Sequence, residues 1–220
     1  MAPNHLRAIA FDFDGTLVRL TIDFARMRRD VMGVLASYGV HDPSVLSLYV
    51  LEMVDAAAAQ LVARGRDPAP MRAEAHAALE AVECEAARRA RPIPGARGML
   101  EALRQKGYGL AVVTRNSGRS ARTAFEGVEG LVDAFLPREA VCHVKPHPEH
   151  LGRCLDLLGV RPDEALMVGD HPMDVRSGKA QGMMTAGVLT GNSSRADLAS
   201  AEPDWILDDV TGLLRVLFEP

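Results

Sequence analysis

Two aspartates stand one residue apart in the segment FDFDGTLV, which follows directly on a run of apolar residues near the N-terminus. Two carboxylates this close repel each other, and burying them without partners costs free energy. A positively charged group between them would relieve that repulsion. Asp12 and Asp14 are therefore candidates for a site that binds a cation.

Further polar residues follow other apolar, strand-like runs. Thr114 ends the run YGLAVVT, Asp170 ends EALMVGD, and Lys145 lies in the loop HVKPHP. The carboxyl ends of parallel strands meet at one edge of a sheet, where α/β proteins bind ligands. We therefore expect Thr114 and Asp170 to converge on Asp12 and Asp14, with Lys145 within reach.

Each of these residues alone has a simpler explanation. An aspartate after a strand is often a helix N-cap, and a lone lysine before a proline is usually solvated. Three carboxylates at one sheet edge would nevertheless repel one another. Mg²⁺ resolves the conflict, because it takes oxygen ligands and needs only a few carboxylates beside water and substrate phosphate. Taken together, the residues indicate a magnesium site that handles phosphate.

The elements that would position these residues are a first strand before the helical segment described below and an alternation of helices and strands after residue 93. Strand patterns lie near 7–14, 108–114, 133–137, 164–170, 184–191 and 204–207, and helical patterns near 95–107, 117–128, 146–160, 174–181 and 208–218. This alternation predicts a parallel sheet covered by helices on both faces. The expected fold class is α/β, a Rossmann-like three-layer core.

The segment between residues 18 and 92 has a different composition. It is rich in Ala, Leu, Met, Arg and Glu, and helical patterns cover 24–39, 42–65 and 67–90. We expect an all-helical insertion at 18–92, within a core formed by 1–17 and 93–220.

The insertion begins with a short basic cluster, Arg26, Arg28 and Arg29. We interpret most of this cluster as a solvated helix face. The alternative is that one of these arginines contacts an anionic substrate.

The composition excludes several classes of protein. The chain has 220 residues, 48% of them hydrophobic, with a formal net charge of -4. An acidic balance argues against nucleic-acid binding, and no apolar run approaches the roughly 18 residues of a membrane helix. The three cysteines form no C-x-x-C pair, so we expect reduced thiols that pack as small residues in a cytoplasmic protein. The oligomeric state, monomer or homodimer, stays open.

Three histidines, His143, His147 and His150, raise the question of a zinc site. Their spacing matches no standard structural zinc pattern, and no cysteine pair accompanies them. We instead expect His147 and His150 to begin a helix and face solvent.

Four motifs occur in a fixed order along the chain: DFDGT at 12–16, Thr114 after VV, Lys145-Pro146, and GDHPMD at 169–174. In this order they resemble the haloacid dehalogenase superfamily of aspartate-nucleophile phosphotransferases, and its phosphoglycolate-phosphatase-like hydrolases in particular. The helical insertion after the first motif is similar to the type 1 cap domain of that superfamily. The resemblance covers nearly the whole chain and implies a Mg²⁺-dependent phosphatase acting on a small phosphate ester.

The resemblance also implies roles for the matching residues. Asp12 is the nucleophile that forms an aspartyl-phosphate, and Asp14 is the general acid and then the base. Mg²⁺ is held by Asp12, Asp170 and the backbone carbonyl of Asp14. Lys145 supplies a second positive charge, and Asp174 supports the metal ligands or pairs with Lys145.

The residues that face the substrate are less tightly specified. The resemblance implies that Thr114 and the backbone amides of Arg115 and Asn116 donate to the transferring phosphate oxygens. His171 touches substrate or a mobile cap, or only packs beside its proline. Arg115 stands where such relatives often carry Asn, so Asn116 is the alternative for that position.

The substrate is left open between phosphoglycolate-like, sugar and nucleotide phosphates. Val18-Arg19-Leu20-Thr21 departs from the Asp-Ser pair common among phosphoglycolate-phosphatase-like members. Asp14 itself argues for phosphate esters, since a dehalogenase needs no acid there. A phosphomutase of β-phosphoglucomutase type and a non-catalytic phosphate-binding protein remain the alternatives.

Overall fold

A computed structural model describes residues 5–19 and 21–218. Contacts divide the chain into two compact units: a helical unit, Thr21–Ala86, and a core unit built from the segments before and after it. A short antiparallel pair, β2 (Val18–Arg19) and β3 (Arg91–Pro92), belongs to the core unit close to where the chain leaves and re-enters it.

The core unit contains a six-stranded sheet with the order β5-β4-β1-β6-β7-β8, in which every neighbouring pair is parallel. Its strands are β1 (Ala8–Phe11), β4 (Gly109–Val113), β5 (Ala134–Leu136), β6 (Ala165–Gly169), β7 (Met184–Val188) and β8 (Trp205–Leu207). The predicted α/β fold with a parallel sheet is confirmed. Because β1 lies in the middle, the residues that follow it are flanked by the ends of β4 and β6.

The central strand shows why the sheet is buried on both faces. Successive side chains of a strand point to opposite faces. Ile9 and Phe11 enter one apolar cluster, while Ala8 and Ala10 enter the cluster on the other face. Both faces of β1 are therefore apolar, as expected for a parallel strand covered by helices on each side.

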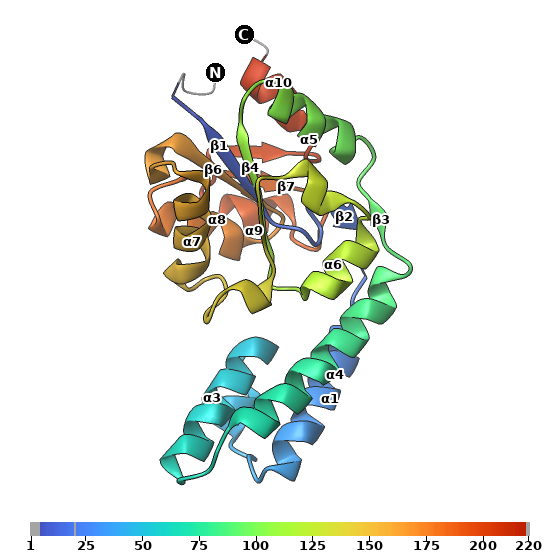
Figure 1. The fold of residues 1–220 in the computed structure, drawn as a ribbon, viewed down its shortest axis with the longest axis vertical. Helices are drawn as coiled ribbons and strands as arrows, with labels where there is room; N and C mark the ends of the chain where they lie inside the picture. Colours follow the sequence, from blue (N-terminus) through green and yellow to red (C-terminus); the bar gives the residue numbers. More distant parts are fainter. Residues whose placement is uncertain (1–4, 20, 219–220) are drawn as a thin grey trace. The chain divides into compact units, whose positions relative to one another are not determined.

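The helices form the two outer layers. The face that receives Ile9 is covered by α5 (Ala96–Gln105), α6 (Gly118–Ala124) and α10 (Gly212–Phe218). The opposite face is covered by α7 (Pro148–Leu158) and α8 (Pro172–Ala180), which lie together in Figure 1. A short helix, α9 (Arg195–Ala199), packs Leu198 against α8 and was not predicted. Three single turns of 3-10 helix, Val128–Leu131, Arg138–Ala140 and Pro162–Glu164, complete the connections.

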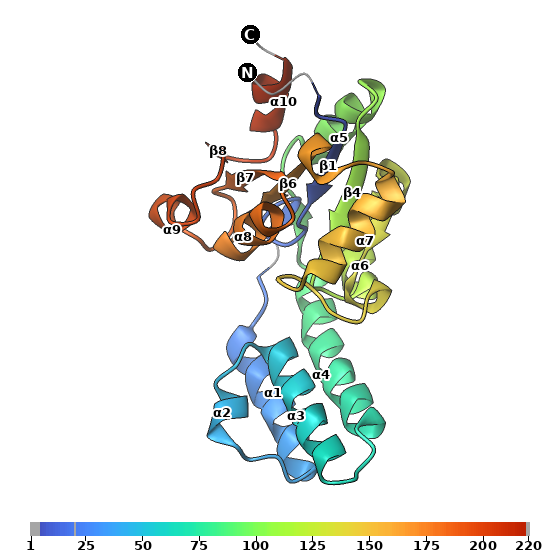
Figure 2. The same ribbon diagram turned by 90° about the vertical axis from the view of Figure 1, so that its left-hand side faces the viewer.

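The helical unit consists of α1 (Phe24–Ser37), α2 (Pro43–Leu46), α3 (Val50–Ala63) and α4, which runs over Ala69–Ala87. Figure 2 shows α1, α3 and α4 side by side. Their shared interior is apolar, and Met27, Met53 and Met71 lie in it.

One prediction for this unit was wrong. The expected continuous helix at 42–65 is two helices, because Tyr49 adopts an extended conformation with ψ 156° and becomes the N-cap of α3. Asp42 caps the first piece through its bond from the Ser44 amide, as the Asp-Pro start signal predicts.

The basic cluster of α1 is largely engaged inside the helical unit. Arg26 pairs with Glu85 at 2.6 Å and with Asp30 at 3.5 Å. Arg28 donates to the backbone carbonyls of Leu46 and Leu48. These contacts hold Arg26 and Arg28 within the helical unit. The third member of the cluster, Arg29, is exposed.

The described helices include none that combines the length and the apolar character needed to cross a membrane. Of the three cysteines, Cys154 is buried in the core as expected, whereas Cys142 is exposed on a loop and does not pack as a small core residue.

Candidate active site

The chain turns sharply where β1 ends. The Asp12 amide still donates to the carbonyl of Val168 on β6, at 2.8 Å, which fixes Asp12 at the carboxyl end of the sheet. The chain then closes a turn through a 2.9 Å bond from the Leu17 amide to the Phe13 carbonyl, with Gly15 at φ +78°. This conformation is open to glycine and strained for other residues. Asp12 is buried and Asp14 is half-buried.

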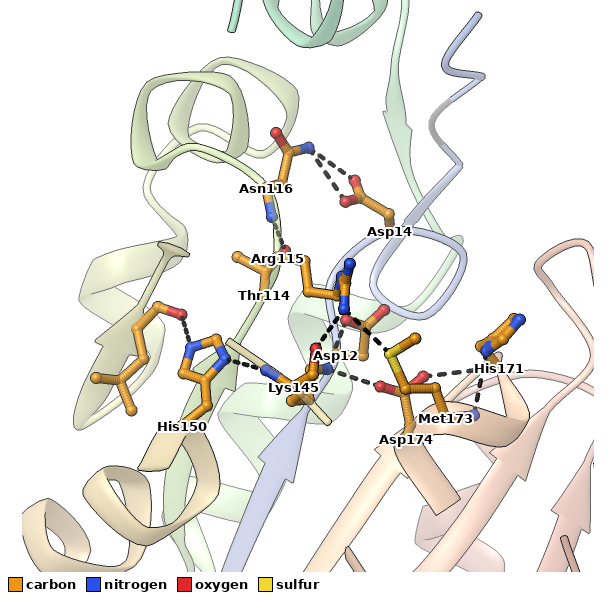
Figure 3. Close-up of polar contacts among 11 residues, drawn as sticks. Asp12, Asp14, Thr114, Arg115, Asn116, Lys145, His150, His171, Met173 and Asp174 are labelled. Carbon is orange, nitrogen blue, oxygen red and sulfur yellow. Dashed lines mark hydrogen bonds and ion pairs between the residues drawn. The ribbon is translucent and has the colours of Figure 1, made fainter. Parts of the chain in front are cut away.

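Lys145 is the cation at the centre of the site. Its side chain is only 1% exposed, and Nζ donates to Asp12 Oδ1 at 2.9 Å and to Asp174 Oδ1 at 2.7 Å (Figure 3). Burial acts to lower the pKa of Lys145, but the charges of Asp12 and Asp174 outweigh burial and raise it. The ammonium group therefore stays charged at any physiological pH.

Asp170 follows β6, and two glycines approach its carboxylate closely. A Cβ atom on Gly191 would lie 1.7 Å from Asp170 Oδ2, and one on Gly15 would lie 2.6 Å from it. Burial, followed by the charges of Asp12 and Asp174, raises the pKa of Asp170 to about 8. The backbone of Gly15 and Gly191 thus packs against this carboxylate and confines it. At this position ionisation is unfavourable unless a further cation is bound.

Asp12 has the same problem to a smaller degree. Burial raises its pKa to about 6, although the charge of Lys145 opposes the shift. The ligand oxygens of Asp12, Asp170 and Asp174 all lie within 4.8 Å of one another. Lys145 can offset only part of this negative charge. An oxygen-only cluster with excess negative charge fits a hard divalent cation such as Mg²⁺.

The Asp14 side chain lies beside the loop after β4 (Figure 3). Asn116 Nδ2 donates to Asp14 Oδ1 at 3.2 Å and to Oδ2 at 3.1 Å (Figure 3). The Asn116 backbone amide donates to Thr114 Oγ1 at 3.0 Å. Asn116 thus contacts both Asp14 and Thr114, and donation from its backbone amide to the substrate phosphate stays a prediction.

Arg115 and His171 lie at the rim of the site. The Arg115 guanidinium donates to the Lys145 carbonyl and lies 3.4 Å from Met173 Sδ. His171 is exposed and is the N-cap of α8, where its Nδ1 accepts the Met173 amide at 3.1 Å. Asp174 accepts the His171 amide at 3.2 Å, so Asp174 joins α8 to Lys145. Direct substrate contacts by Arg115 and His171 stay predictions.

His150 is a member of the site that the sequence analysis placed wrongly. It was expected to face solvent, but it is fully buried in α7. Its Nδ1 accepts the Lys145 amide at 3.2 Å, and its Nε2 lies 3.0 Å from the Leu136 carbonyl, which fixes the proton on Nε2. Burial, reinforced by the charge of Lys145, lowers the pKa of His150 to about 4. A neutral histidine thus holds the backbone of Lys145.

A signal for His150 was present in the sequence. His150, Leu151, Cys154 and Leu155 are the buried residues of α7, and they recur at helical spacing. Positions of this kind form the core-facing stripe of an amphipathic helix. The histidine was assigned to the surface because it is polar, although its position on the stripe is a buried one.

Comparison with known proteins bears directly on this geometry. The family model for haloacid dehalogenase-like hydrolases matches residues 9–188. A phosphoglycolate phosphatase from Haemophilus influenzae is 29% identical over 229 residues, which covers 97% of this chain and 99% of the relative. The pyrophosphatase PpaX from Bacillus cereus is 36% identical over 120 residues. This match covers 54% of this chain and only 56% of that relative.

A solved structure supports the same fold. The crystal structure of a predicted phosphoglycolate phosphatase from Haemophilus somnus superposes with a TM-score of 0.65 at 24% identity, covering 97% of this chain and 98% of that one. At this identity the likeness shows the fold alone. The family match, in contrast, includes the ends of β1, β4 and β6 and the whole Lys145 loop. The chain belongs to the haloacid dehalogenase-like hydrolase family.

Proposed function

We propose that this chain is a Mg²⁺-dependent phosphatase that hydrolyses a small phosphorylated molecule through an aspartyl-phosphate on Asp12. The observation that carries the proposal is the placement of Asp12. It is buried at the end of the central strand, paired with Lys145 at 2.9 Å, and its carboxylate clusters with those of Asp170 and Asp174. The full-length relative from Haemophilus influenzae, a phosphoglycolate phosphatase, supports the same reaction class.

In the first step, an oxygen of Asp12 attacks phosphorus and the bond from phosphorus to the leaving oxygen breaks. Asp12 Oδ1 accepts from Lys145, so we assign the attack to Oδ2. Asp14 donates a proton to the leaving oxygen, and the alcohol departs. The 3.1 and 3.2 Å bonds from Asn116 keep the Asp14 carboxyl oriented for that transfer.

In the second step, a water molecule attacks the phosphorus of the aspartyl-phosphate. Asp14, now ionised, takes a proton from this water, and the bond from phosphorus to Asp12 breaks. Inorganic phosphate is released, Asp12 regains its carboxylate, and Asp14 regains its proton. The same residue therefore acts as acid and then as base.

Charge neutralisation is the main demand of both steps, because a carboxylate has to approach a phosphate dianion. Lys145 supplies a fixed positive charge that the surrounding carboxylates keep protonated. Mg²⁺, when held by Asp12, Asp170 and the backbone carbonyl of Asp14, would neutralise further phosphate charge and lower the repulsion. Asp174 positions Lys145 through its 2.7 Å bond.

The remaining parts of the proposal concern substrate and setting. The substrate class is a phosphoglycolate-like, sugar or nucleotide phosphate, with pyrophosphate added because one relative is a pyrophosphatase. We also propose that residues 18–92 act as a cap domain on a core formed by 1–17 and 93–220. A cytoplasmic location stays a prediction.

The test is hydrolysis of an aryl phosphate with Mg²⁺ by the wild type and by Asp12→Asn. Loss of the nucleophile should lower kcat by about 10³-fold or more, because catalytic residues that act as a unit lose most of their effect together. Asp156→Asn is the matched control, since Asp156 is exposed on α7. It should keep wild-type activity.

Two results would overturn the proposal. One is equal activity of the wild type and Asp12→Asn. The other is no hydrolysis by the wild type across a panel of phosphoglycolate, sugar phosphates, nucleotides and pyrophosphate. Measuring free phosphate against isomerised sugar phosphate on the same panel separates a phosphatase from a phosphomutase.

A further inference from the structure

The loop that carries Lys145 has a second, outward face. The His147 amide donates to the Val144 carbonyl at 3.0 Å and closes a turn with Lys145 near its tip. Lys145 points into the buried carboxylate cluster, whereas His143 and His147, on either side of it, are exposed. Their rings are in contact in a tilted arrangement, with centroids 4.4 Å apart and an angle of 33° between the ring planes.

Glu149 joins the two histidines from the first turn of α7. Its Oε2 lies 2.9 Å from His143 Nδ1, and its carboxylate also accepts the backbone amides of Cys142, at 2.8 Å, and His143, at 3.1 Å. These donors lower the pKa of Glu149, with the Cys142 amide as the largest cause. The carboxylate is therefore ionised at neutral pH and accepts the proton on His143 Nδ1.

We propose that His143, His147 and Glu149 form a binding site for a borderline divalent metal ion of the Zn²⁺ class. One ligand atom from each of the three residues lies within 4.8 Å of the other two, outside the carboxylate cluster at the strand ends. Two imidazoles and one carboxylate are a ligand set that suits Zn²⁺, Co²⁺ or Ni²⁺ and not Mg²⁺.

The arrangement needs only local adjustment to take an ion. Ligand nitrogens and oxygens sit about 2.0–2.2 Å from Zn²⁺, so neighbouring ligand atoms stand roughly 3 Å apart around the ion. The His143–Glu149 pair already has that separation, at 2.9 Å. The proton that now joins the two would have to leave His143 Nδ1, either to Nε2 or to solvent, because a ligating nitrogen carries no proton. His147 would give up one weak capping bond, in which its Nδ1 accepts the Glu149 amide at 3.2 Å. Both rings are exposed, so this rotation meets little resistance.

The consequence of binding follows from the turn itself. An ion held by His143 and His147 would tie together the two sides of the turn that presents Lys145. Binding of the ion can nevertheless be tested apart from the proposed phosphatase activity, since none of the three ligands lies in the carboxylate cluster.

The experiment is a calorimetric titration with Zn²⁺ in the presence of excess Mg²⁺, on untagged protein. The wild type should bind Zn²⁺ at this site, and the double variant His143→Ala/His147→Ala should lose one binding equivalent. Each single variant should weaken that site by roughly tenfold to a hundredfold or more. His41→Ala, which removes an exposed histidine of the helical unit, should keep the full stoichiometry.

Absorption spectra with Co²⁺ identify the ligands. A site of two imidazoles and a carboxylate gives visible bands without the charge-transfer band of a thiolate. Equal stoichiometry in the wild type and the double variant would overturn the proposal, as would Zn²⁺ uptake by the carboxylate cluster alone. A thiolate band that disappears in Cys142→Ser would overturn the ligand set. A thermal melt without metal checks that each variant is folded.

Discussion

Asp170 and Glu149 are carboxylates in two clusters of the same core unit, and their pKa values move in opposite directions. Burial raises the pKa of Asp170 to about 8, whereas backbone and side-chain donors lower the pKa of the more exposed Glu149. In the strand-end cluster of Asp12, Asp170, Asp174 and Lys145, Asp170 is half-buried and the other three residues are buried. The cluster of Glu149 and its two histidines keeps its charge in contact with water.

The contrast shows what each cluster requires of its surroundings. Buried like charges are stable only if a cation or a proton joins them, because desolvation and mutual repulsion both oppose ionisation. Glu149 needs no such partner, since two backbone amides already stabilise its ionised form. We therefore expect perturbations of the strand-end cluster to have large effects, and perturbations of the outer cluster to have small ones.

The largest effect is expected from Lys145→Met, which keeps the length of the side chain and removes its charge. Asp12 and Asp174 would then be buried together without their shared cation. We expect kcat to fall by about 10²- to 10³-fold, and the free energy of unfolding without metal to fall by about 3–5 kcal/mol. Aryl phosphate hydrolysis and urea unfolding measure the two effects.

The matched control for this variant is Lys179→Met. Lys179 is exposed and lies 3.7 Å from Glu202, a surface pair that contributes at most about 1 kcal/mol. A wild-type kcat in Lys145→Met would show that catalysis does not need the buried charge. It would contradict the expectation that changes in the strand-end cluster have the larger effects.

The next effect concerns the two glycines that pack against Asp170. In Gly191→Ala the new Cβ would lie 1.7 Å from Asp170 Oδ2, so the carboxylate has to move. We expect the Mg²⁺ concentration for half-maximal activity to rise by roughly tenfold to a hundredfold, as for other changes that displace a metal ligand. A Mg²⁺ titration of activity measures this shift.

Gly98→Ala is the control, because Gly98 is exposed on α5 and a Cβ there meets no atom within 4 Å. It should leave the Mg²⁺ dependence unchanged and stabilise the helix by at most about 1 kcal/mol. An unchanged Mg²⁺ dependence in Gly191→Ala would mean that Asp170 does not hold the ion.

The strand-end cluster could be predicted from the sequence, whereas the hydrogen bonds that hold the neighbouring Asp14 in place could not. Asp12 and Asp170 follow apolar strands, and parallel strands bring such residues to one edge whatever the details of packing. The bond from Asn116 to Asp14 depends on the shape of one loop and on one side-chain rotamer. Neither leaves a periodic pattern in the sequence.

The helical unit shows the same limit. Helical patterns predicted helices over 24–39 and 67–90, and α1 and α4 lie within these ranges. The break at Tyr49 was missed because it depends on tertiary packing and on the backbone conformation of one residue. A zinc site at His143, His147 and His150 was considered and set aside on the spacing of these residues, which does not show that a turn brings the rings of His143 and His147 into contact.

A moderate effect is expected from His150→Ala, on the inner side of the Lys145 turn. The change would leave the Lys145 amide and the Leu136 carbonyl without this partner and open a cavity. We expect a loss of about 2–4 kcal/mol in the free energy of unfolding, together with a lower kcat from a less ordered Lys145. His150→Gln, which can both donate and accept, should restore part of each.

His147→Ala is the comparison on the outer side of the turn. It removes a weak helix cap and should cost about 1 kcal/mol or less, with kcat unchanged. Urea unfolding and Mg²⁺-dependent hydrolysis measure both variants. Equal losses in His147→Ala and His150→Ala would show that burial does not separate the two sides of the turn.

The smallest effect is a pH dependence that separates Asp170 from Glu149. Between about pH 6.5 and 8 the unfolded chain has Asp170 ionised, whereas the folded chain keeps its proton, because its pKa is raised to about 8. The folded state then binds more protons, so the free energy of unfolding falls as pH rises. His150 contributes in the opposite direction below its ordinary value of 6.5, which is why the interval starts there.

Thermal melts in EDTA should therefore show a loss of about 2 kcal/mol across this interval, or roughly 4–8 °C in Tm. Glu149, with a lowered pKa, is ionised in both states throughout and adds no slope. Saturating Mg²⁺ should remove the loss by stabilising the ionised carboxylates, and Asp170→Asn should remove it without metal. A Tm in EDTA that stays level or rises would mean that burial does not hold the proton on Asp170, and the opposite shifts of the two carboxylates would then need another cause.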